Sequence, residues 1–427
     1  MAAPTRGPLL LDLSPLRDDR TFRNLFVART ILLFGVGIVA VTVPLEVYAR
    51  TGSTPAVSAV AAVESVAFLV GFLGAGVLAD RSDRWRLVIV TWLVCGLTFA
   101  GLAANAMWVS STVLTAIFVA LNGLSGSVCL TAMLAVMPAI VDREKLHAVG
   151  ALNTVSLRLG TVLAPVVGGV VFAASSAAWN YGAGAAAALL TWVLLLVSPP
   201  PGQGGRSGAP EPEEPSAPES PLRALATGAR FVVGEPVVLG VMLAGVVGMV
   251  GGGSFVLLPA FVEARFDGAP TAVGAMYSAL SAGLVVGSLG SGWIRRHSRP
   301  GLLLLGLMVV CFGCFTAAGA APTLVLVLAA LVAAGATNAL EEVLRYTLLQ
   351  LRTPDELLGR VNSLFQAQGM TGAAIGAVVA GAVGGLVGAA DALWVYNAGL
   401  AGVAVLTAAV LGPLRRATRE SIEKETA

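Results

Sequence analysis

The feature that most constrains this chain is the length of its segments without a charged residue. No Asp, Glu, Lys or Arg occurs between residues 87 and 141, 159 and 205, or 301 and 340. At a helical rise of about 1.5 Å per residue, each segment can cross a hydrocarbon core of about 30 Å twice. Single spans are expected at 23–48, 56–79, 236–262, 268–294, 361–390 and 392–414. The sequence therefore predicts an all-α membrane protein with twelve transmembrane helices.

Composition and charge distribution agree with this prediction. Charged residues make up 12% of the chain, against about a quarter in soluble domains, and mean hydropathy is +0.85. If the N-terminus is cytoplasmic, only two of the 26 Lys and Arg residues, Arg50 and Arg265, lie outside, and three lie within spans, Arg29, Arg158 and Arg345. The positive-inside rule thus predicts that both termini face the cytoplasm.

The middle of the chain separates two similar halves. Residues 198–220 are rich in Pro, Gly, Ser and Glu, a composition typical of a flexible linker. "SPLRDDRTFRNLFVAR" before the first span resembles "SPLRALATGARFVVGE" before the seventh, and Gly71, Gly74 and Gly76 reappear at one spacing as Gly287, Gly290 and Gly292. We expect two pseudo-symmetric six-helix halves with a substrate site between them. The predicted boundaries are a cytoplasmic segment 1–22, a first half 23–198, a linker 199–228, a second half 229–412 and a tail 413–427.

A charged turn separates the second and third spans. The segment "GVLADRSDRWR" matches the pattern GxLaDRxGRR through Gly76, Asp80, Arg81 and Arg84, with Asp83 in place of Gly. In this turn the chain resembles the major facilitator superfamily. The resemblance implies that the Asp and Arg residues bridge this loop to the other half and form a cytoplasmic gate. The alternative is that these positive charges only fix the topology.

Span five carries a second motif. "RLGTVLAPVVGG" is similar to the antiporter pattern of exporting members of the superfamily, through Gly160, Pro165, Gly168 and Gly169, with Ala164 in place of one Gly. Small residues let a second helix approach closely, and Pro165 permits a bend. The alternative is ordinary small-residue packing in a Gly-rich membrane protein.

Longer segments resemble the bacterial enterobactin (siderophore) exporter family. These include "AAWNYGAGAAAALL", "SRPGLLLL" and "LRYTLLQLRTPDELLGRVNSLFQAQGMTGAAIGA". The resemblance implies proton-driven siderophore export across the bacterial cytoplasmic membrane by a monomer. The expected partners are a small-molecule substrate, protons and the lipid bilayer, and no nucleic acid, cofactor or metal is expected. Related branches export macrolides and other drugs, which is the alternative function. A membrane enzyme or sensor is disfavoured because the two histidines, His147 and His297, lie in separate loops.

Ionisable residues within spans are costly and therefore mark candidate functional sites. Glu64 has no basic residue at helical spacing and is the predicted proton carrier; a water-facing Glu without such a role is the alternative. Glu341 and Glu342 precede Arg345 by one turn, so one internal ion pair is expected and the other carboxylate stays free. Arg158, near the middle of span five, suits the phenolates or carboxylates of an anionic siderophore. Arg29 lies nearer the cytoplasmic end and is expected to reach the interface.

The few aromatic residues suggest two roles. Phe255, Tyr277 and Phe365 are predicted to form an aromatic cavity that stacks on catechol rings, with core packing as the alternative. Trp179, Tyr181 and Tyr396 fall where the outer interfacial belt is expected.

Overall fold

The computed structural model describes residues 20–140, 146–197 and 221–418, and all regular elements in these ranges are helices. The first half comprises α2 (Arg20–Thr51), α3 (Thr54–Arg81), α4 (Arg84–Ala104), α5 (Thr112–Ile140), α6 (Leu146–Ala174) and α7 (Ala177–Leu196). The second half comprises α8 (Pro221–Gly234), α9 (Pro236–Val250), α10 (Ser254–Arg265), α11 (Pro270–Leu289), α12 (Pro300–Ala320), α13 (Leu324–Arg352), α14 (Asp355–Val387), α15 (Ala389–Val410) and α16 (Gly412–Arg416). Within these described ranges, eleven helical segments are long and apolar enough to span a membrane, and Gly160–Ala174 in α6 is a shorter apolar helix. The predicted fold class is confirmed.

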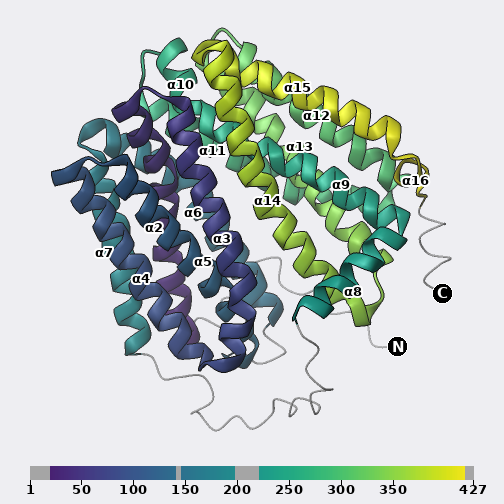
Figure 1. The fold of residues 1–427 in the computed structure, drawn as a ribbon, viewed down its shortest axis with the longest axis horizontal. Helices are drawn as coiled ribbons and strands as arrows, with labels where there is room; N and C mark the ends of the chain where they lie inside the picture. Colours follow the sequence, from purple (N-terminus) through teal and green to yellow (C-terminus); the bar gives the residue numbers. More distant parts are fainter. Residues whose placement is uncertain (1–19, 141–145, 198–220, 419–427) are drawn as a thin grey trace, which may run out of the picture.

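The two halves meet at one end of the molecule and diverge toward the other (Figure 1). They contact each other through α3 with α14 and α6 with α11. A Cβ built on Gly384 of α14 would lie 2.8 Å from the Thr54 side chain, at the start of α3, and one on Gly169 of α6 would lie 3.2 Å from Gly274 in α11. We call this end, which carries residues 51–54, the closed end. The other end, where α7 stops and α8 begins, is the α7–α8 end.

The internal repeat extends to individual side chains. Four pairs share one spacing: Pro44 and Pro259, Arg50 and Arg265, Trp179 and Trp394, and Tyr181 and Tyr396. Each proline lies inside a helix of the first span of its half, in α2 and in α10. The second of these spans is interrupted, because a 3₁₀ turn at Gly251–Gly253 joins α9 to α10. Two halves that descend from one pattern therefore differ at their first helix.

The predicted linker is too long at its C-terminal end. Residues 221–228, assigned to the linker from composition, form the first part of α8. This helix packs on α14, where Gly228 lies against Arg360 and Leu364, and its Val232 is buried. Residues 413–416 of the predicted tail likewise belong to α16, and α2 already begins at Arg20, within the predicted N-terminal segment.

The charged turn motif joins α3 to α4. Asp83 has a φ of −61°, which any residue adopts, and its carboxylate accepts hydrogen bonds from the backbone N–H groups of Trp85 and Arg86. Asp83 thus caps α4, so this turn has no need of the Gly found in the superfamily pattern. The structure describes only the backbone of Gly76, Asp80, Arg81 and Arg84, and their gating contacts stay a prediction.

Candidate functional site

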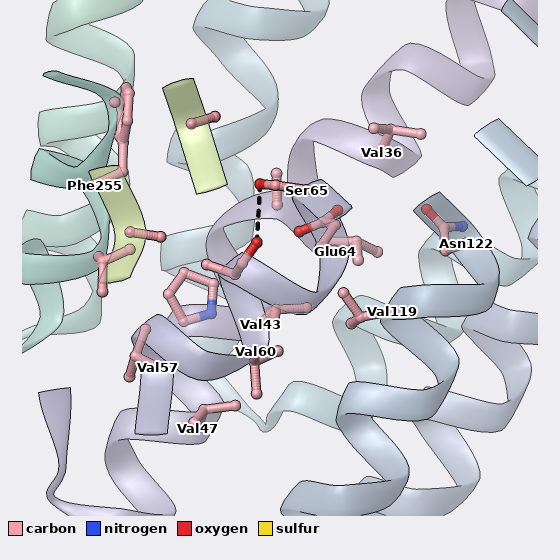
Figure 2. A pocket seen from close by; sticks show the side chains of 18 of the residues that line it. Val36, Val43, Val47, Val57, Val60, Glu64, Ser65, Val119, Asn122 and Phe255 are labelled. Carbon is pink, nitrogen blue, oxygen red and sulfur yellow. Dashed lines mark hydrogen bonds between the residues drawn. The ribbon is translucent and has the colours of Figure 1, made fainter. Parts of the chain in front are cut away.

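A cavity of about 220 Å³ lies between the halves. Helices α2, α3, α4 and α5 supply the wall from the first half, and α10, α11, α14 and the turn Gly251–Gly253 supply the wall from the second. Its polar side chains include Glu64, Ser65 and Asn122, while valines cover much of the rest. Figure 2 shows Glu64 and Asn122 on one side of the cavity and Phe255 on the other. The cavity therefore presents a polar wall opposite an aromatic one.

Glu64 is the only acidic residue that lines this cavity among the described residues. It lies ten residues after the start of α3 at Thr54, or about 15 Å deep at helical rise, close to the middle of a bilayer. Its side chain is open to the cavity, and no ion pair or hydrogen bond joins it to another described residue. A carboxylate in such a place binds a proton, a cation or a hydrogen-bond donor.

Close helix packing places Asn122 beside Glu64. A Cβ on Gly123 of α5 would come within 2.8 Å of the Glu64 backbone oxygen, so glycine lets α5 approach α3. The Asn122 amide donates to Thr98 Oγ1 at 3.2 Å and to Cys95 Sγ at 3.4 Å, which fixes its orientation from α4. The polar wall is thus preorganised by the first half alone.

Two of the three predicted aromatic residues meet in this cavity. The rings of Phe255 (α10) and Tyr277 (α11) lie 4.7 Å apart, and both side chains line the wall. Phe365 was wrongly grouped with them. It is buried in α14, its ring lies below the Arg345 guanidinium at 5.4 Å, and it lines neither this cavity nor the one described next.

A second cavity of about 270 Å³ lies within the second half. It is lined mainly by apolar side chains of α11, α12 and α14, with Asn338 and Glu341 of α13 as its polar members. Three residues line both cavities: Gly252, Phe255 and Ala373. The two cavities are therefore adjacent chambers, with a shared wall at the 3₁₀ turn that breaks the seventh span.

Glu341 forms the ion pair that helical spacing predicts. Its Oε1 lies 2.8 Å from Nε of Arg345, and both side chains are at most 3% exposed. Glycines of α9 make room for this pair, because a Cβ on Gly245 would lie 2.6 Å from Arg345 Nη1. Glu342 is exposed instead, and it lines neither chamber. The second half therefore neutralises its buried carboxylate.

The first half contains a buried carboxylate that sequence reasoning missed. Glu46 of α2 accepts a hydrogen bond of 2.6 Å from the Tyr181 hydroxyl in α7 and forms an ion pair with Arg50. Tyr181 is fully buried, so its predicted place in the interfacial belt was wrong, and so was that of Tyr396, which is buried and donates to the Val250 oxygen at 2.6 Å. Trp179, in contrast, is 69% exposed. The sequence signal that could have revealed the buried carboxylate is the spacing of Glu46 and Arg50, which lie one helical turn apart.

The antiporter-like segment of α6 packs on two helices. A Cβ on Gly160 or Gly168 would meet α2, at Leu33 and Ile38, whereas Gly169 faces α11. Pro165 lies on this second contact, since its backbone oxygen approaches Gly274. The segment thus ties α6 to its own half and contributes to the closed end.

The two remaining candidate cations are less informative. Arg29 of α2 is partly buried and lines neither chamber. The structure describes only the backbone of Arg158, in α6, so its predicted contact with substrate stays a prediction.

Comparison with known proteins identifies the family. Residues 11–425 match the model of the family described as transmembrane secretion effector. The chain is 36% identical over 412 residues to the enterobactin exporter EntS of Citrobacter koseri, covering 96% of both chains, and 35% identical over 408 residues to that of Escherichia coli O1:K1 / APEC, covering 95% of both.

Solved structures support the same fold at low sequence identity. The nucleoside transporter NupG superposes with a TM-score of 0.72 at 14% identity, covering 93% of this chain and all of that one. A bacterial homolog of the human lysosomal transporter Spinster, inward-facing and unoccupied, superposes with a TM-score of 0.71 at 15% identity, covering 93% and 96%. The named relatives and the apolar helices together make the chain a multi-pass inner-membrane transporter. It belongs to the major facilitator superfamily, in the family that includes the enterobactin exporters.

Proposed function

We propose that this protein exports a siderophore of the enterobactin type from the cytoplasm, in exchange for protons that Glu64 carries. The observation that carries the proposal is the Glu64 carboxylate, which has no partner in the described part of the chain and lies in a cavity shared by both halves. The relatives named enterobactin exporter support the substrate class.

The chemistry of the cavity suits catechol groups. Hydroxyls of a neutral catechol donate to an ionised carboxylate such as Glu64, and its ring stacks against Phe255 and Tyr277. No described residue of either chamber wall is a cation. An anionic part of the substrate would therefore depend on Arg158, which the sequence places on α6 near mid-span.

Competition at one carboxylate would couple the two fluxes. Ionised Glu64 accepts hydrogen bonds from substrate at both carboxylate oxygens, whereas protonated Glu64 is a weaker acceptor and itself a donor. Binding of a proton and binding of the substrate hydroxyls therefore oppose each other at the same group. Alternating access then carries substrate one way and the proton the other. The halves diverge at the α7–α8 end, which we place in the cytoplasm by the positive-inside rule, so the described conformation faces inward (Figure 1).

Transport by the purified protein in proteoliposomes tests the proposal. Glu64→Gln keeps the size of the side chain, and we expect it to lower enterobactin transport driven by a pH gradient at least about tenfold. Glu356→Gln is the control, because Glu356 is an exposed carboxylate at the start of α14. Undiminished pH-driven transport by Glu64→Gln would contradict the role of Glu64.

The second candidate function is efflux of hydrophobic drugs by the same machinery. It is favoured by the chamber walls, which are mainly apolar. Deleting the protein should lower the siderophore secreted under iron limitation while leaving its synthesis intact. Unchanged secretion together with new sensitivity to antibiotics would instead support drug efflux.

A further inference from the structure

The 3₁₀ turn Gly251–Gly253 contains one glycine that packing does not require. A Cβ on Gly251 would lie 2.6 Å from the Phe312 ring, and one on Gly253 would lie 2.6 Å from the Tyr396 hydroxyl. A Cβ on Gly252 would meet nothing within 4 Å, and its φ is not in the left-handed region. Glycine within a helix costs about 0.5–1 kcal/mol relative to alanine. Neither crowding nor backbone conformation explains the glycine at position 252.

Gly252 occupies the boundary between the two chambers. It is exposed and lines both of them, together with Phe255 and Ala373. Any side chain at position 252 would project into space that the chambers share. The residue type at this position therefore decides how much room connects them.

The chamber sizes indicate why such room matters. Pockets for drug-sized ligands measure about 300–1,000 Å³. The chambers, at about 220 and 270 Å³, are each smaller than this range, yet together they fall within it. Each chamber also has its own polar group, Glu64 in the first and Asn338 in the second. Two small apolar chambers with separate polar groups fit a ligand that has at least two arms.

We propose that one substrate molecule occupies both chambers at once and passes over Gly252, which makes Gly252 a specificity-determining residue for multi-armed ligands. One arm lies between Glu64 and the Phe255–Tyr277 pair, and another lies in the chamber of Asn338. A single-arm ligand needs only one chamber. This inference rests on the proposed function, because it takes a siderophore with several catechol arms as the substrate.

Binding of two ligands by a graded series of variants tests this arrangement. Isothermal titration calorimetry on the purified full-length chain would compare enterobactin with a single-catechol amide. For Gly252→Leu we expect affinity for enterobactin to fall at least about tenfold and affinity for the fragment to stay within about twofold. Gly252→Ala should have a smaller effect in the same direction. Gly306→Leu is the matched control, because Gly306 is an exposed glycine of α12 with open space at its Cβ and lies outside both chambers.

Three outcomes would overturn the inference. Equal losses of affinity for both ligands, or unchanged binding of enterobactin by Gly252→Leu, would show that the substrate does not extend over this residue. If Gly252→Leu fails to fold, Ala373→Leu fills the shared wall from α14 and is judged by the same comparison. Failure of the unaltered protein to bind enterobactin would overturn the proposed substrate and this inference with it. If the unaltered protein binds enterobactin and the Gly252 variants bind it equally well, only the inference is overturned.

Discussion

The two halves share a helical plan but treat their buried carboxylates differently. In the second half, Glu341 is paired with Arg345 one turn away in the same helix. In the first half, Glu46 is paired with Arg50 near the closed end, while Glu64 faces the cavity without a partner among the residues that the structure describes. Equivalent positions show the same divergence, since Arg50 pairs with Glu46 whereas Arg265 lies over the Phe261 ring at 5.8 Å. The paired carboxylates thus lie within one half each, and the carboxylate without a partner among the described residues faces the cavity that both halves line.

The largest effect is expected from breaking the ion pair of the second half. Arg345→Met leaves Glu341 buried without its counter-charge and should lower the free energy of unfolding by about 3–5 kcal/mol. Thermal unfolding of the purified protein measures this loss. The double variant Glu341→Gln/Arg345→Met should recover most of it, and Glu64→Gln should unfold like the unaltered protein. If Arg345→Met is as stable as the unaltered protein, the ion pair does not distinguish Glu341 of the second half from Glu64 of the first.

The next comparison uses the equivalent tyrosines. Tyr181 donates to a carboxylate in the first half, and Tyr396 donates to a backbone oxygen in the second. Hydrogen bonds to charged groups contribute about 1.5–3 kcal/mol and neutral ones about 0.5–1.5 kcal/mol. Tyr181→Phe should therefore destabilise the protein more than Tyr396→Phe in the same unfolding assay. The reverse order would mean that the Glu46 network contributes little to stability.

A third prediction concerns the contact between the halves. The side chain of Gly169→Val would meet the Pro270 oxygen, 2.8 Å from a built Cβ, and should disfavour the closed end by about 1–3 kcal/mol. Spin-label distances between α6 and α11 would lengthen at the closed end. Gly182→Val in α7 is the control, because its Cβ would meet nothing within 4 Å. Unchanged distances in Gly169→Val would show that this contact yields without separating the helices.

The smallest effect is expected at two equivalent helix starts. Asp83 caps α4 with its side chain, whereas Arg299 at the start of α12 makes no side-chain cap. Asp83→Ala should lower stability by about 1 kcal/mol, and Arg299→Asp should raise it by up to about the same amount. Thermal unfolding of both variants checks the signs. A loss of stability in Arg299→Asp would show that the positive charge there outweighs a cap.

Features that depend on local sequence were predicted well. The charge-free runs predicted the spans, and helical spacing predicted the Glu341–Arg345 pair. Features that depend on which face of a helix turns toward the protein interior were not predicted well. Most spans are apolar around their whole circumference, so periodicity does not show which face turns inward. Phe365 was assigned to the cavity for this reason. The Tyr181–Glu46 contact joins the first and last spans of one half, which no local pattern reveals.

The closed end also constrains how the molecule responds to its surroundings. The residues that bring α3 to α14 and α6 to α11 there are Thr, Ser, Pro and Gly, none of which carries a charge. Attraction between such uncharged surfaces falls off within an ångström or so of contact, and dissolved ions do not screen it. Screening by dissolved ions should therefore leave the contacts of this barrier almost unchanged between dilute buffer and physiological ionic strength.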